Sequence, residues 1–108
     1  MYFFAGFAAL HISDDQAAVR WLLKARQTNP TFNLSSLYLA AAYVGIGEEE
    51  NAQANLAEYL KVRPTFSIAG WKKWVPTRNP VVAKQRERMS DAWRRLGVPE
   101  DEPPVADR

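Results

Sequence analysis

The sequence contains no cysteine and only one histidine among its 108 residues. Without cysteine there is no disulfide, no thiolate nucleophile and no cysteine-based zinc site, so core packing alone must hold the chain together. His11 by itself cannot build a multi-histidine metal site, and any serine–histidine triad would have to run through it. We therefore expect a non-catalytic protein without metal or cofactor, in a reducing, cytoplasmic setting.

Long hydrophobic runs are also missing. The apolar run from Tyr2 to Leu10 is far shorter than the ~20 residues of a membrane-spanning helix, and no basic segment precedes it. We expect neither a membrane anchor nor a signal peptide. Because no capping residue stands ahead of this run, we expect the chain to be cut from a longer array, in which an earlier element covers its first aromatic residues.

The composition fits one small globular domain, with 47% hydrophobic and 24% charged residues. The net charge of +2 hides a strongly basic segment at 61–95, where ten lysines and arginines face only two acids. One interpretation is the solvated face of a helix; the other is a surface for nucleic acid or another anionic partner. The basic residues of that alternative surface are Lys72, Lys73, Arg78, Arg86 and Arg94.

Internal repetition is the clearest pattern in the sequence. The tripeptide Pro-Thr-Phe at 30–32 recurs at 64–66, an offset of 34 residues. The same offset relates three further pairs: Ala8 and Ala42, Ala18 and Ala52, Leu22 and Leu56. Each unit therefore contains the same structural elements in the same order.

Each unit is predicted to contain two helices. In the second unit, apolar residues recur at three- and four-residue spacing over 34–44, and Gly45 and Gly47 then mark a turn. Glutamates at 48–50 begin the next helix, which ends before Pro64. In the first unit, the helix Tyr2–His11 is followed by Ser13 as the expected N-cap of a helix that ends before Pro30.

This pattern resembles the tetratricopeptide repeat family, whose units are 34-residue helical hairpins. The matching positions are Gly6, Ala18, Leu22, Ala25, Pro30, Ala40, Tyr43, Ala52, Leu56 and Pro64. Tyr59 departs from the pattern, because a small residue is usual there. The resemblance implies a right-handed α-solenoid of about two and a half hairpins, with repeats at about 1–32 and 33–66.

The third unit begins at Ser67 and then changes character. Pro76 shortens its first helix, and Asn79 with Pro80 opens a helix with one apolar side and one charged side, which includes Arg88. We expect 67–99 to form a partial repeat and capping helix, and 100–108 a mobile tail. This segment resembles the end of tetratricopeptide regions in bacterial adenylate/guanylate-cyclase-like proteins, which implies a fragment of a larger signalling or regulatory protein.

The family resemblance implies that a concave face, lined by the first helix of each unit, binds a protein or peptide segment. An apolar and aromatic face of this kind suits an amphipathic helix. Some members of this family bind the acidic C-terminal tails of chaperones through lysine and asparagine residues in the groove. Apolar residues occupy these positions here, so we do not expect this carboxylate clamp. The other interpretation is that many of these side chains are simply core. The predicted groove residues are Phe3, Phe4, Phe7, Leu34, Leu37, Tyr38, Ala41, Val44, Ile68, Trp71 and Lys72.

The apolar first helix also predicts self-association. Phe3, Phe4 and Phe7 would leave an apolar surface uncovered, so we expect a homodimer through this helix. Nucleic acid and membrane are not the expected partners. The sequence thus favours a protein-binding scaffold, with electrostatic binding through 61–95 as the alternative.

Overall fold

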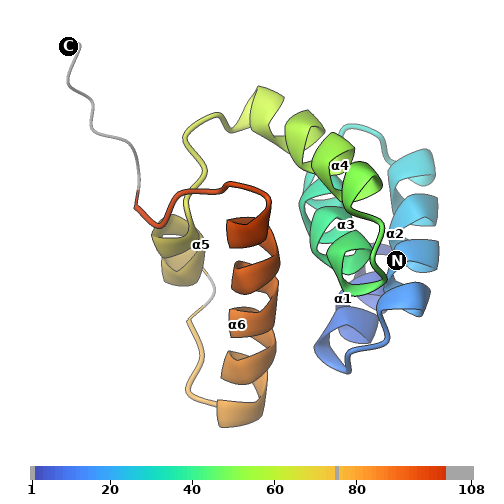
Figure 1. Ribbon diagram of the computed structural model, residues 1–108. Coiled ribbons are helices and arrows are strands. Elements are labelled where there is room, and N and C mark those ends of the chain that lie inside the picture. Colours follow the sequence, from blue (N-terminus) through green and yellow to red (C-terminus); the bar gives the residue numbers. More distant parts are fainter. Residues whose placement is uncertain (1, 75, 102–108) are drawn as a thin grey trace, which may run out of the picture.

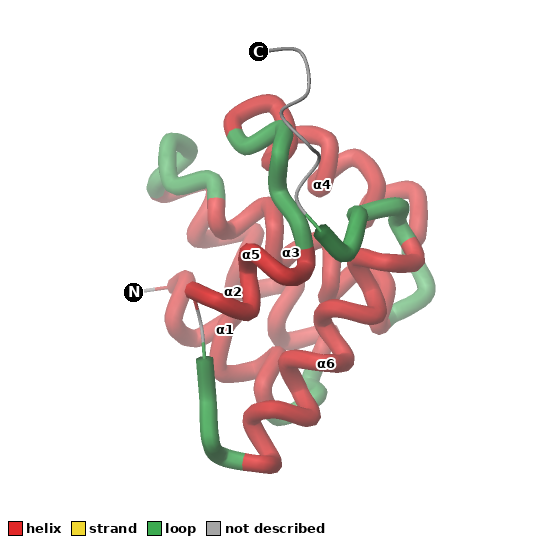
Figure 2. The backbone as a smooth tube through the Cα atoms, turned by 90° about the vertical axis from the view of Figure 1, so that its left-hand side faces the viewer, coloured by secondary structure: helices red, strands yellow, loops and turns green. Residues whose placement is uncertain are grey.

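The computed structural model describes residues 2–74 and 76–101, and helices form most of that part of the chain (Figure 2). The helices are α1 (Tyr2–His11), α2 (Asp15–Thr28), α3 (Leu34–Gly45), α4 (Glu49–Val62), α5 (Ile68–Trp74) and α6 (Pro80–Arg95). No strand occurs within the described ranges. The expected all-α class is therefore confirmed.

Local side-chain signals set the helix starts, with one correction. The N-cap of α2 is Asp14 and not Ser13, because the Asp14 carboxylate accepts a hydrogen bond of 3.2 Å from the Ala17 amide. Ser13 instead adopts a positive φ of 62° in the turn before it. At α6 the sequence prediction is right: Asn79 Oδ1 accepts hydrogen bonds from two first-turn amides, and Pro80 occupies the first turn.

The first four helices pack in chain order, with α1 against α2, α2 against α3, and α3 against α4 (Figure 1). Gly6 permits the close approach of α1 and α2, because a Cβ at this position would lie 2.5 Å from Leu22 Cγ. Gly47 provides a φ of 80° in the turn between α3 and α4. The helix α3 lies at the centre of this array, and its residues 35–43 are all buried.

The last two helices depart from this sequential order. α6 packs against α3 and α1, which lie far earlier in the chain. Within the described residues, α6 is the only helix whose backbone comes close to that of α5. Backbone hydrogen bonds from Ile68 to Pro99 (3.0 Å) and from Ala69 to Glu100 (2.8 Å) join the start of α5 to the segment after α6. The expected mobile tail, 100–108, thus begins at a residue that accepts a backbone hydrogen bond; residues 102–108 lie outside the described residues.

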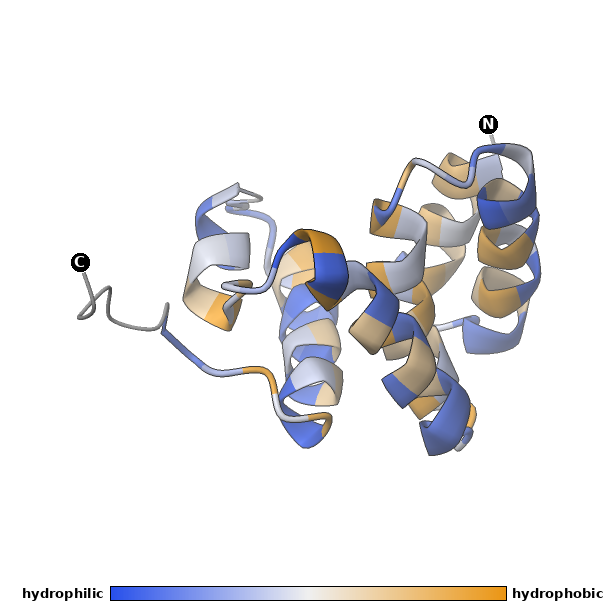
Figure 3. Ribbon diagram, turned by 90° about the horizontal axis from the view of Figure 1, so that it is seen from above, coloured by the Kyte–Doolittle hydropathy of each residue, from blue (hydrophilic) through white to orange (hydrophobic). Residues whose placement is uncertain are grey.

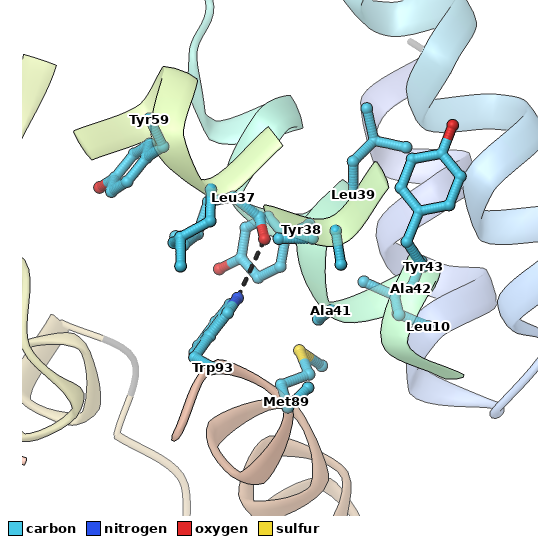
Figure 4. Close-up of a cluster of buried hydrophobic side chains, with 14 of the residues drawn as sticks. Leu10, Leu37, Tyr38, Leu39, Ala41, Ala42, Tyr43, Tyr59, Met89 and Trp93 are labelled. Atoms are coloured by element: carbon cyan, nitrogen blue, oxygen red, sulfur yellow. Dashed lines mark hydrogen bonds between the residues drawn. The ribbon is translucent and has the colours of Figure 1, made fainter. Parts of the chain in front are cut away.

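Trp93 of α6 forms the centre of the contact with α3 (Figure 4). Its Nε1 donates a 3.0 Å hydrogen bond to the Leu37 carbonyl oxygen. Its ring meets Trp71 edge-on at 4.7 Å, and Trp71 Nε1 donates to the Tyr38 hydroxyl at 3.1 Å. Both indole N–H groups therefore have partners inside the core. Hydrophobic and hydrophilic stretches alternate along the helices of the molecule (Figure 3).

Candidate functional site

The predicted groove is divided by the structure into buried and accessible parts. Leu37, Tyr38, Ala41, Ile68 and Trp71 are buried, with α6 packed across this face of α3. The open groove expected there needs correction, because these side chains belong to the core. Phe3, Phe7, Leu34 and Val44 are half-buried, while Phe4 and Lys72 are exposed.

A polar contact fixes α6 over this face. Arg88 Nη1 lies 3.1 Å from each Asp15 carboxylate oxygen, and Arg88 Nη2 donates to the Leu10 carbonyl oxygen at 2.7 Å. Burial raises the pKa of Asp15 above its usual value, and the Arg88 charge opposes that rise. Arg88 was expected on the wet side of its helix; it is half-buried and joins α6 to the junction of α1 and α2.

The aromatic part of the predicted groove that stays accessible lies on α1, at the N-terminal end of the chain. Phe4 is 72% exposed, Tyr2 39% and Phe32 37%. Together with Phe3, they line a cavity of about 240 Å³ between α1, the end of α2 and the loop after it. We call these four residues the aromatic end.

Ring contacts connect the aromatic end to the core. Phe3 meets Phe32 edge-on at 4.9 Å and stacks with Phe7 at 5.9 Å. Phe7 in turn meets the buried Tyr38 edge-on at 5.0 Å. The partly buried rings of Phe3 and Phe7 therefore connect the exposed rings to the core.

Two residues of the aromatic end were missing from the predicted groove. Tyr2 stacks on Trp21 of α2 at 5.9 Å, and the ammonium of Lys24 lies 5.3 Å from the Trp21 ring. Phe32 was noticed only as part of the repeated Pro-Thr-Phe. Phe32 lies in the loop between two predicted helices, so it belongs to the apolar side of neither helix. This position in the loop was the signal that could have identified it as a surface residue.

The residues that match the repeat signature lie at helix crossings and helix ends. Pro30 and Pro64 follow α2 and α4 and are exposed. The remaining eight positions are buried: Gly6, Ala18, Leu22, Ala25, Ala40, Tyr43, Ala52 and Leu56. Tyr59, which departs from the pattern, is also buried and meets Phe66 edge-on at 5.2 Å.

Several basic residues of the 61–95 segment are engaged in ion pairs. Lys72 lies 2.8 Å from Glu87, and Arg94 lies 2.9 Å from the same carboxylate. Arg94 also pairs with Asp91 at 2.5 Å and with Glu100, and its pKa is raised by these acids. Lys73 and Arg78 are exposed and Arg86 is half-buried. Acidic neighbours thus neutralise part of this surface.

His11 interacts within its own helix. Its Nδ1 lies 2.8 Å from the Phe7 carbonyl oxygen and so donates to it, while its ring lies 4.3 Å from the Phe7 ring. Among the described residues, no three histidine or acidic side chains come together as a possible metal site.

No family model, curated protein or solved structure matches this chain. Within the described ranges, no helix has the length and apolar character needed to cross a membrane. The function of this chain is therefore inferred from the surface features of the molecule.

Proposed function

We propose that this chain is a non-catalytic protein-interaction module of the tetratricopeptide type, whose aromatic end binds an apolar segment of a partner protein. The observation that carries the proposal is the exposed cluster of Tyr2, Phe4 and Phe32 around a cavity. Aromatic residues in partly enclosed pockets provide much of the binding energy at protein interfaces.

The repeat supports the tetratricopeptide part of the proposal. The 34-residue offset relates α1 and α2 to α3 and α4, and the packing of these helices in chain order is compatible with a solenoid. The absence of cysteine fits a cytoplasmic setting, and the end segment fits a module of a larger bacterial signalling protein. A second copy of this chain is one partner that the aromatic end would accept.

The partner site proposed here differs from a groove along the whole concave face. The middle of that face is filled by α6, so a partner meets only the end formed by α1 and the α2–α3 loop. Electrostatic binding through the basic segment has less support, because Lys72 and Arg94 already pair with acids.

Selection of displayed peptides on the intact chain tests the proposal. We expect the selected peptides to carry leucine or aromatic anchors and to lose about tenfold or more in affinity for Phe4→Ala, because the exposed Phe4 ring is removed. Val81→Ala is the matched control, since Val81 is 68% exposed on α6. Equal binding to both variants, or no selected peptide, would show that the aromatic end is not the site.

Sedimentation of the same variants separates a partner protein from self-association. A dimer that dissociates on Phe4→Ala and persists in Val81→Ala identifies a second copy as the occupant. A monomer in all variants, combined with selected peptides, identifies a different protein. Tyr38 is unsuitable for such tests, because it is buried and bonded to Trp71.

A further inference from the structure

A second hollow lies on a different side of α3 from the one that α6 covers. It is a surface groove of about 820 Å³ between the end of α2, the start of α3 and one side of α4. Ser36 and Tyr43 of α3 line it. Figure 4 shows the Tyr43 ring turned away from Trp93 and Met89. We call this hollow the polar groove.

Two hydroxyl groups open into the polar groove without partners. Ser36 is 5% exposed and Tyr43 is 9% exposed, yet neither hydroxyl forms a hydrogen bond with any described residue. The two hydroxyl oxygens are themselves accessible to solvent from the groove, although the rest of each side chain is buried. Both hydroxyls are therefore available to a ligand that enters the groove.

Arg26 adds a positioned positive charge to the polar groove. Its Nη1 donates a hydrogen bond to Asn55 Oδ1, and Asn55 Nδ2 donates to the Asn51 carbonyl oxygen at 2.9 Å. Asn55 is only 6% exposed, so it holds the guanidinium firmly. The other guanidinium N–H groups have no hydrogen-bond partner in the described part of the chain, and they remain free to donate.

The charge of Arg26 is partly compensated, because Lys61 and, to a smaller extent, Arg26 lower the pKa of the nearby Glu58 carboxyl. Glu58 is the one acid that lines the polar groove within the described residues, and it lies 2.6 Å from Lys61, whose charge offsets it. The helix α3 also begins beside the groove, with no side-chain cap from Asn33 and no acid in its first turn. The positive end of that helix therefore adds to the charge of Arg26.

The repeat shows that the fold does not require these polar residues. At an offset of 34 residues, Asn51 and Asn55 correspond to Ala17 and Trp21, and Tyr43 corresponds to Ala9. The first unit thus builds the same helices with apolar residues at these positions. Asn51 and Asn55 are thus specific to the second unit, whereas Arg26 comes from the first.

We propose that the polar groove binds an oxyanion, the carboxylate or phosphate group of a small ligand. Arg26 is the main binding residue, because a planar guanidinium forms paired charge-assisted hydrogen bonds with such groups. The Ser36 and Tyr43 hydroxyls donate to the same ligand. The volume of the groove is in the range of small-molecule sites.

Nuclear magnetic resonance titration of the full chain with inorganic phosphate and with succinate, at constant ionic strength, tests this proposal. We expect saturable shifts at the Ser36 and Tyr43 amides and at the Asn55 side-chain amide. Saturation by phosphate alone identifies a phosphate ligand, and saturation by succinate alone identifies a carboxylate; saturation by both supports the shared oxyanion chemistry. If neither probe saturates, or if chloride produces the same shifts, the proposal is wrong.

Three variants assign the binding to the polar groove. Arg26→Gln should weaken binding about tenfold, and Tyr43→Phe about threefold, because each removes hydrogen-bond donors to an anion. Arg20→Gln is the matched control, since it makes the same change on an exposed part of α2. Tyr43→Phe should leave the unfolding temperature almost unchanged. Equal weakening by Arg20→Gln would reveal general charge attraction, and none of these residues belongs to the aromatic end.

Discussion

The array α1–α4 and the closing segment, residues 68–101, are built on different principles. In the array, each helix packs on its neighbour in the chain, and small residues such as Gly6 let the helices approach closely. In the closing segment, single large side chains make the contacts: Trp93 reaches Leu37, and Arg88 reaches Leu10. The array depends on repeated packing, whereas the closing segment depends on a few anchors, so single substitutions should affect the two parts differently.

Trp93→Ala should produce the largest effect on the closing segment. Trp93 is fully buried, donates to the Leu37 carbonyl and packs on Trp71, so we expect a loss of about 3–5 kcal/mol in the free energy of unfolding. Urea denaturation followed by circular dichroism measures it. Trp74→Ala is the control, since Trp74 is 51% exposed and contacts Arg63. Similar losses in both variants would contradict the role of Trp93 as an anchor.

Arg88→Met should have an intermediate effect, because it leaves the Asp15 carboxylate and the Leu10 carbonyl without their partner. We expect a loss of about 1–3 kcal/mol near neutral pH. Burial already raises the pKa of Asp15, and without Arg88 it rises further. A raised carboxyl pKa penalises folding above that pKa, so the loss should shrink as the pH falls through it.

A double-mutant cycle between Arg88→Met and Asp15→Asn checks this contact. A coupling energy near zero, or a loss that grows on acidification, would show that Arg88 does not stabilise α6 through Asp15.

Glu87→Gln should have the smallest effect. Hydrogen bonds from Lys72 and Arg94 lower the pKa of Glu87, so its contribution to stability is present above its ordinary value of 4.5 and is lost as the pH falls through the lowered value. The side chain is half exposed, and we expect about 0.5 kcal/mol or less at neutral pH. Thermal unfolding across the acidic range should show wild type and variant converging; a constant difference would rule out the ion pairs as its source.

Hydrophobic periodicity was sufficient to predict the helices and much of the core. Apolar spacing identifies Leu22, Leu56 and Tyr59 as inward-facing, and all three are buried. The proline and asparagine signals at 79–80 also place the start of α6 correctly. These features depend on nearby residues, which a single sequence contains in full.

The position of α6 could not be predicted in the same way. Apolar spacing shows that Leu37, Tyr38 and Ala41 prefer to be covered, but it does not show whether a partner or a later helix of the same chain covers them. Arg88 was misplaced for a related reason, since its partners are 73 and 78 residues away in the chain. The polar groove was missed, although Asn51 and Asn55 at positions that are apolar in the first unit were a visible signal.

The distance along the chain between Leu37 and Trp93 affects how the protein is made. The two residues that join α3 to α6 are 56 positions apart. At a synthesis rate of about 5–20 residues per second, the apolar face of α3 exists for on the order of several seconds before Trp93 is added. During that interval the nascent chain exposes Leu37, Tyr38 and Ala41 to the surroundings. The newly synthesised chain is therefore more prone to non-specific association and aggregation than the folded protein.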